Sequence, residues 1–161
     1  MIDQYLSEFV YGGIDGIITT FSIVAGSTGG DLLKNVIIIL GISNVLSDGY
    51  SMGISRYISA KTEIKQGLLK NKNSFISGLV TFVSFIVVGI TPIVPFFIYN
   101  GNMAKTISLL IACVVFFTIG VLKGKVLKEN MLLGGLEVLG IGLSAAFISY
   151  FVGEYVSYFT K

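Results

Sequence analysis

The 161-residue chain has no histidine and a single cysteine, and these absences narrow its chemistry. Without histidine, imidazole metal ligands, Ser-His triads and histidine proton relays are excluded. Cys113 lies alone in an apolar run, so it forms neither a disulfide nor a cysteine zinc site within one chain. It also lacks a base partner for nucleophilic catalysis. We therefore expect no enzyme and no bound cofactor, and any metal must use carboxylate, amide, hydroxyl, carbonyl or thioether groups.

Charged residues are scarce as well. Only 12% of the residues are charged and 53% are hydrophobic, whereas a soluble domain has about 25% charged residues. So few charges cannot cover a surface that faces water, and the mean hydropathy of +0.86 agrees. The net charge of +2 offers no broad basic surface for nucleic acid. The composition predicts an integral membrane protein whose partner is the lipid bilayer, with no nucleic acid.

Five apolar segments are long enough to cross a bilayer, which takes about 20 residues of helix. They lack the strict alternation of membrane β-strands, so helices are the better prediction. Pro92 and Pro95 lie late in the third segment and predict a kink or an early stop there. We predict an all-α membrane protein with one domain, residues 1–161, and five transmembrane helices at about residues 5–28, 33–59, 74–99, 104–123 and 131–156.

The lysines are distributed unevenly between the two sides of this predicted bundle. By the positive-inside rule, the N-terminus lies in the cytoplasm and the C-terminus in a lumen or outside the cell. A vacuolar-type membrane and a plasma membrane fit this orientation equally well. On the N-terminal side are Lys61, Lys65, Lys70, Lys72, Lys123, Lys125 and Lys128, and on the opposite side are Lys34, Lys105 and Lys161.

The second segment carries polar residues in a row. Asn44, Asp48, Met52 and Arg56 are four residues apart and lie on nearly the same helix face. A carboxylate and a thioether together offer mixed hard and soft donors for a transition metal, although a lone methionine is usually an apolar filler. Asp48 and Arg56 alternatively form a structural pair, or Arg56 extends to the head groups and leaves Asp48 free to bind a cation.

The first segment contains a second acid at membrane depth. Asp15 lies among glycines in YGGIDGIITTFSIVAG (11–26), and two acids on neighbouring helices favour a cation site, whereas an acid near the interface is merely solvated. For Glu8 and Glu137 we expect solvation at the interface, with at most a supporting role. Small residues let helices approach closely, which predicts a dimer interface built by the first two helices. The small residues in question are Gly12, Gly16, Ser47, Gly49, Ser51, Gly53 and Ser55.

These motifs resemble a known family. DGIITTFSIVAG, ISNVLSDGYSMGISRYISAKTE and LLGGLEVLGIGLSAAFISYFVG are similar to the first, second and fifth spans of the vacuolar iron transporter family. The resemblance implies a homodimer of five-helix protomers with a cation path along the subunit interface. It also implies that Fe(II), and often Mn(II), is moved out of the cytosol in exchange for protons, with Asp15 and Met52 lining the path.

The chain departs from that family at several positions. It lacks the acidic cytosolic insert between the second and third spans, and Asn44 stands where some members have Glu. Asp48 and Arg56 replace residues that are usually smaller or acidic. The leading hypothesis is a divalent transition-metal transporter whose metal ligands are Asp15, Met52, Asp48 and Asn44. The alternative is a non-transporting membrane scaffold or subunit in which the polar rows only join helices.

Overall fold

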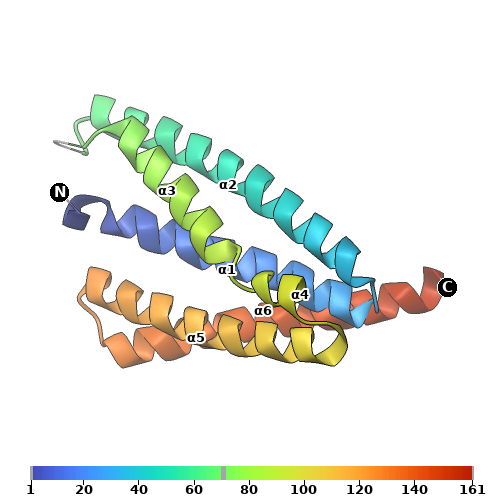
Figure 1. Cartoon of the computed structure of the whole chain (residues 1–161). Helices are drawn as coiled ribbons and strands as arrows, with labels where there is room; N and C mark the ends of the chain where they lie inside the picture. Colours follow the sequence, from blue (N-terminus) through green and yellow to red (C-terminus); the bar gives the residue numbers. More distant parts are fainter. Residues whose placement is uncertain (1, 70–71, 161) are drawn as a thin grey trace.

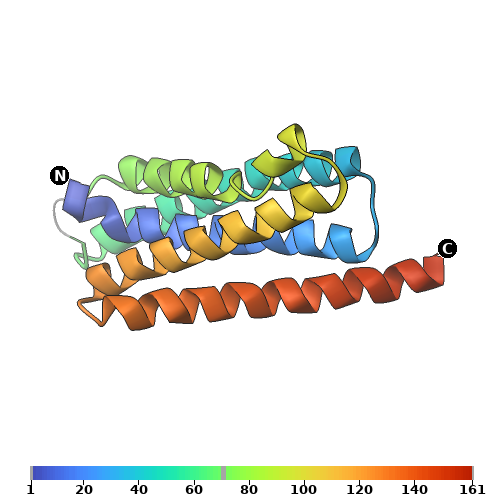
Figure 2. The same ribbon diagram turned by 60° about the horizontal axis from the view of Figure 1, so that its bottom comes forward.

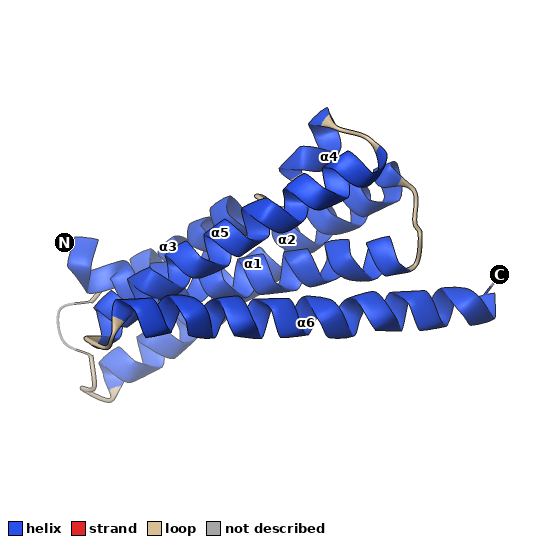
Figure 3. Ribbon diagram, turned by 90° about the horizontal axis from the view of Figure 1, so that it is seen from below, coloured by secondary structure: helices blue, strands red, loops and turns tan. Residues whose placement is uncertain are grey.

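The computed structural model describes residues 2–69 and 72–160, and every regular element in these ranges is a helix (Figures 1 and 3). Among the described residues, α1, α2, α5 and α6 are long and apolar enough to cross a membrane. The all-α class is confirmed, and five crossings stay a prediction. The elements are η1 (Ile2–Tyr5), α1 (Leu6–Gly29), α2 (Lys34–Lys65), α3 (Ser74–Gly89), α4 (Val94–Ile98), α5 (Gly101–Leu127) and α6 (Met131–Thr160).

The third predicted span is divided into two helices. α3 ends at Gly89, and a turn containing Pro92 leads into the short α4, whose first turn contains Pro95. Proline lacks the backbone N–H that a continuous helix needs, so the predicted break is confirmed. The Ser108 hydroxyl of α5 donates a 2.6 Å hydrogen bond to the Pro92 carbonyl and so fixes the break against the bundle. α3 alone has 16 residues and is about 24 Å long.

α1 lies at the centre of the bundle and packs against α2, α3, α5 and α6. The two chain ends lie at opposite ends of the bundle, and the α2–α3 and α5–α6 connections share the end that carries the N-terminus (Figure 1). Ile17, Phe21 and Phe116 belong to the buried core, where the two phenylalanine rings meet edge to face with their centroids 5.9 Å apart. The last turns of α6 extend past the other helices (Figure 2).

Glycines let α3 approach both α1 and α2. A Cβ atom at Gly12 or Gly16 of α1 would collide with the α3 backbone, and one at Gly53 of α2 would lie 2.8 Å from Phe82 Cβ. Gly49 is buried against Phe85 and its neighbours on α3. The prediction that these four glycines form an interface between protomers is therefore wrong, because they pack against α3 of the same chain. The serines of the predicted interface, Ser47, Ser51 and Ser55, are exposed.

Candidate cation site

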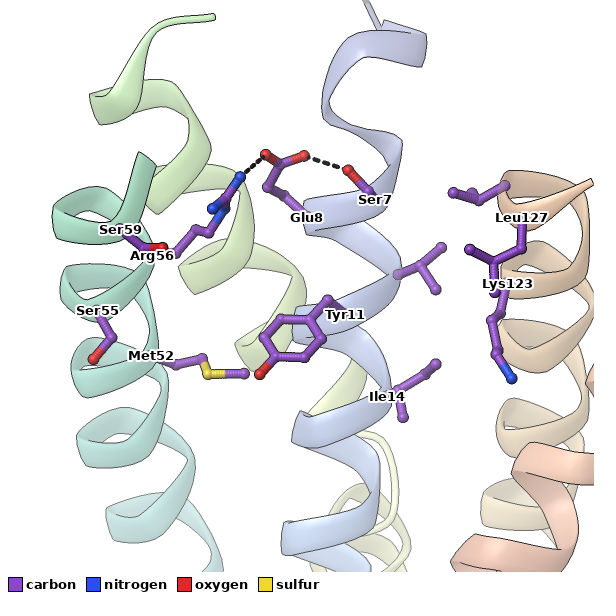
Figure 4. Close-up of a pocket in the computed structure, with 12 residues that line it drawn as sticks. Ser7, Glu8, Tyr11, Ile14, Met52, Ser55, Arg56, Ser59, Lys123 and Leu127 are labelled. Atoms are coloured by element: carbon purple, nitrogen blue, oxygen red, sulfur yellow. Dashed lines mark hydrogen bonds and ion pairs between the residues drawn. The ribbon is translucent and has the colours of Figure 1, made fainter. Parts of the chain in front are cut away.

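The candidate site lies where α1 and α2 run antiparallel, with a register that places their polar residues in layers. Starting from the N-terminal end of the bundle, Glu8 lies beside Arg56, and Tyr11 lies beside Met52 (Figure 4). One turn farther along, Asp15 and Asp48 are close enough for their charges to repel. From Glu8 to Asp15 the helix rises about 10 Å. The predicted site residues of the two helices are thus brought together.

The Asp15–Asp48 layer contains polar groups without partners. Both residues are half-buried, and within the part of the chain that the structure describes neither carboxylate has an ion pair or a side-chain hydrogen bond. One turn beyond Asp48, the buried amide nitrogen of Asn44 also lacks a hydrogen-bond partner among the described residues. Two neighbouring acids without a counter-ion among the described residues form an environment suited to a cation, whereas the unpartnered Asn44 nitrogen is a hydrogen-bond donor and calls for an acceptor.

Met52 lines a groove of about 600 Å³ that runs between α1, α2 and α5 at the N-terminal end of the bundle. Its thioether extends from α2 toward Tyr11 on α1, whose side chain is 61% exposed (Figure 4). Val10, Ile14 and Val126 form an aliphatic part of the groove wall, and serine and charged side chains line the rest of it together with Tyr11 and Leu127. Met52 therefore offers a soft sulfur donor between this groove and the two acids.

The interpretation of Glu8 as a solvated interfacial acid is wrong. Only 2% of Glu8 is exposed, and its carboxylate accepts hydrogen bonds from Arg56 at 2.9 Å and from Lys72 at 2.8 Å. Ser7 and Ser77 also donate to it. A buried carboxylate needs such partners, and here they come from α1, α2, α3 and the α2–α3 connection. Glu8 thus joins these segments at one end of the bundle.

Both expectations for Arg56 also need correction. Its guanidinium neither pairs with Asp48 nor extends freely to the head groups, because it binds Glu8 and makes a second ion pair with Glu63 at 3.1 Å. Asp48 and Arg56 are two helical turns apart, about 12 Å along the axis, and Arg56 points toward the N-terminal end of the bundle. Sequence reasoning missed Glu63 because it ended the helix near residue 59, whereas α2 continues to Lys65.

This geometry predicts that Asp48 and Arg56 act independently. In a double-mutant cycle of Asp48→Asn and Arg56→Gln, we expect the two changes in the free energy of unfolding to add within about 0.5 kcal/mol, because the two side chains share no partner among the described residues. Denaturation of the four purified proteins in mixed micelles, followed by helicity, measures this. Recovery of stability in the double mutant, relative to Arg56→Gln, would show that the two side chains are a pair after all.

Glu137 lies apart from the two central acids. Its half-exposed carboxylate on α6 accepts a hydrogen bond from Lys123 of α5, so it is paired as well as partly solvated. Lys123 lines the groove, whereas Glu137 does not. In the described residues no group of three or more Asp, Glu, Cys or His side chains comes together to hold a metal ion. Asp15 and Asp48, with Met52 and Asn44, therefore make an incomplete ligand set within one chain.

The sequence matches a known protein family over most of its length. The model of the VIT family matches residues 6–66 and 64–154, which include α1, α2, α3 and α5, most of α6, and both central acids. The chain belongs to the VIT family. The two matched segments of this VIT-family chain meet at the end of α2, and eight residues, 66–73, connect α2 to α3. A short connection agrees with the absence of an insert between the second and third spans.

Relatives of this VIT-family protein include named iron transporters. A vacuolar iron transporter of Toxoplasma gondii is 46% identical over 60 residues, which are 37% of this chain and 20% of the relative. A vacuolar iron transporter of Plasmodium berghei is 38% identical over 61 residues, 38% of this chain and 22% of the relative. The matched part is thus about a fifth of each of these relatives. An uncharacterized protein of Methanocaldococcus jannaschii is 25% identical over 164 residues, covering 89% of this chain and 85% of that protein.

Membership of the VIT family and the apolar helices together identify an integral membrane protein. Its exterior agrees, because large apolar side chains such as Leu40, Val114 and Phe147 are exposed where a soluble protein would present charges.

Proposed function

We propose that this VIT-family chain transports divalent transition-metal cations, Fe(II) first and Mn(II) second, out of the cytosol in exchange for protons. The observation that carries the proposal is the pair of half-buried carboxylates of Asp15 and Asp48, which are near enough to interact electrostatically and have no ion pair among the described residues. Ionisable residues at membrane depth are costly and rare, and they commonly mark ion pathways. Met52 adds a soft sulfur donor nearby, and Asn44 carries an amide oxygen one helical turn from Asp48. The names of the Toxoplasma and Plasmodium relatives favour iron as the cargo.

We further propose that the working unit is a homodimer with the path between two copies of α1 and α2. One chain supplies two carboxylates and one thioether, and a two-fold axis beside them would double this set. Exposed small residues on α2 favour such a contact because they let a second copy approach closely. The serines at residues 43, 47, 51, 55 and 59 are all exposed along one side of this helix. In this proposal five helical passes cross the bilayer and the N-terminus is cytoplasmic.

Proton exchange follows from the chemistry of the same oxygens. A carboxylate that binds a metal ion must release its proton, so a proton and a divalent cation compete for Asp15 and Asp48. Protons arriving from the acidic side would displace the metal there, and metal arriving from the cytosol would displace the protons. The carboxylate pair thus couples the two fluxes without further groups.

The proposal is tested by metal flux into liposomes that contain the purified full-length protein and an internal metal indicator. We expect saturable uptake of Fe(II), kept reduced, and slower uptake of Mn(II), with both accelerated when the lumen is more acidic than the bath. Protein-free liposomes give the background. No flux of either metal from folded, inserted protein would overturn the proposal and favour the scaffold alternative. Flux that is indifferent to the pH gradient would overturn proton exchange alone.

A further inference from the structure

The groove that Met52 lines is also lined by a charged side chain that is held from two directions. Arg56 lies one helical turn from Met52 on α2, toward the N-terminal end of the bundle (Figure 4). One guanidinium nitrogen is 2.9 Å from Glu8 of α1, and the other is 3.1 and 3.2 Å from the two oxygens of Glu63. A planar guanidinium with both nitrogens bonded in this way has a defined position.

The four charges of this cluster balance, but only some of them face the groove. Glu8 and Glu63 are opposed by Arg56 and Lys72, two acids against two bases. Glu8 and Arg56 both line the groove, but the Glu8 side chain is 2% exposed and that of Arg56 is 20% exposed. Lys72 and Glu63 do not line it. Lys123, the other basic residue in the wall, is paired with Glu137. An ion in the groove therefore meets the guanidinium more directly than the carboxylates that balance it.

We infer that Arg56 is a tethered cation that controls which ions reach Met52 through this groove. Arginine stays protonated at any physiological pH, so its charge is permanent and its access can change only if the side chain moves. The guanidinium disfavours cations in the groove while Glu8 and Glu63 hold it. The inference builds on the transport function proposed above and adds an access-controlling residue to it.

Lys72 provides a matched control because it shares the same carboxylate. Its amine is 2.8 Å from the Glu8 oxygen that Arg56 also binds, yet it lies outside the groove wall. Lys72→Gln and Arg56→Gln each remove one positive charge and one ion pair to Glu8. If the cluster is only structural, the two variants should behave alike, and if Arg56 controls access, only Arg56→Gln should alter the groove.

The test measures the modification rate of a cysteine placed in the groove. In the full-length protein, Cys113→Ala removes the native thiol and Met52→Cys introduces the reporter. The protein is held in lipid nanodiscs, which expose both faces, and is treated with cationic and anionic methanethiosulfonates of similar size. The ratio of the two rates is the readout. Any general change in thiol reactivity cancels in this ratio, and labelling after denaturation reports the total thiol.

We expect Arg56→Gln to raise the cation-to-anion rate ratio roughly fivefold, because removing a unit charge about one helical turn from the thiol changes the cationic and anionic rates in opposite directions. Lys72→Gln and the charge-conserving Arg56→Lys should leave the ratio unchanged. An unchanged ratio in Arg56→Gln, or an equal rise in Lys72→Gln, would overturn the inference. Because labelling needs no metal flux, failure of transport in liposomes leaves this result separately readable.

Discussion

Replacing Asp15 by Asn is expected to reduce Fe(II) flux into liposomes by about tenfold or more. The change keeps the size of the side chain but removes one of the two neighbouring carboxylates, and a loss of about 1.4 kcal/mol in cation binding already corresponds to tenfold. Met52→Leu removes the thioether and keeps an apolar side chain of similar volume. We expect it to lower Fe(II) flux more than Mn(II) flux, because sulfur is the softer donor.

Glu137→Gln is the matched control for the Asp15 variant. It neutralises an acid on α6 that is half-exposed, paired with Lys123 and outside the groove wall, so flux should stay near the wild-type value. Flux is compared at equal amounts of folded, inserted protein. Wild-type flux in both Asp15→Asn and Met52→Leu would contradict the assignment of these side chains as ligands.

Replacing Glu8 by Gln is expected to destabilise the protein by about 3 kcal/mol. The change leaves Arg56 and Lys72 without the carboxylate that both of them bind, and breaking a buried ion pair from one side costs about 3–5 kcal/mol. We place the cost at the low end because Arg56 keeps Glu63 as a partner and both cations retain some solvent contact. Denaturation in mixed micelles, followed by helicity, gives the free energy of unfolding.

The comparison variant is again Glu137→Gln, since its ion pair with Lys123 lies at the surface. Exposed pairs contribute about 0–1 kcal/mol, so this variant should unfold close to the wild-type midpoint. If Glu8→Gln and Glu137→Gln lose similar stability, the buried cluster does not join the N-terminal ends of the helices as we describe.

Long apolar runs made the helices predictable. The predicted segments agree with the observed helices to within a few residues at most ends, and Pro92 and Pro95 marked the break between α3 and α4. The error at the end of α2 had a specific cause. Residues 61–65 are mostly polar and follow the apolar run, so hydropathy could not detect that the helix continues to Lys65.

Packing partners were not predictable in the same way. A glycine indicates that another backbone comes close, but it does not identify that backbone. Gly16 and Gly53 were expected to face a second protomer, and the structure places them against α3 of the same chain. Likewise, the sequence contained Glu8, Arg56 and Lys72, but these residues are separated by many positions and their meeting depends on how α1, α2 and the α2–α3 connection converge.

The sequence alone determined that the protein lies in a membrane, because this depends on composition. It also determined the positions of the helices, which follow from local apolar runs, and the side chains that are available to bind a cation. Tertiary structure decided which charges cancel. The antiparallel register of α1 and α2 places Asp15 near Asp48, with no counter-ion among the described residues, and places Arg56 beside Glu8. The physical reason is that electrostatic interactions fall with distance and with solvent exposure. Both quantities are set by helix packing, which a linear pattern of residues does not contain.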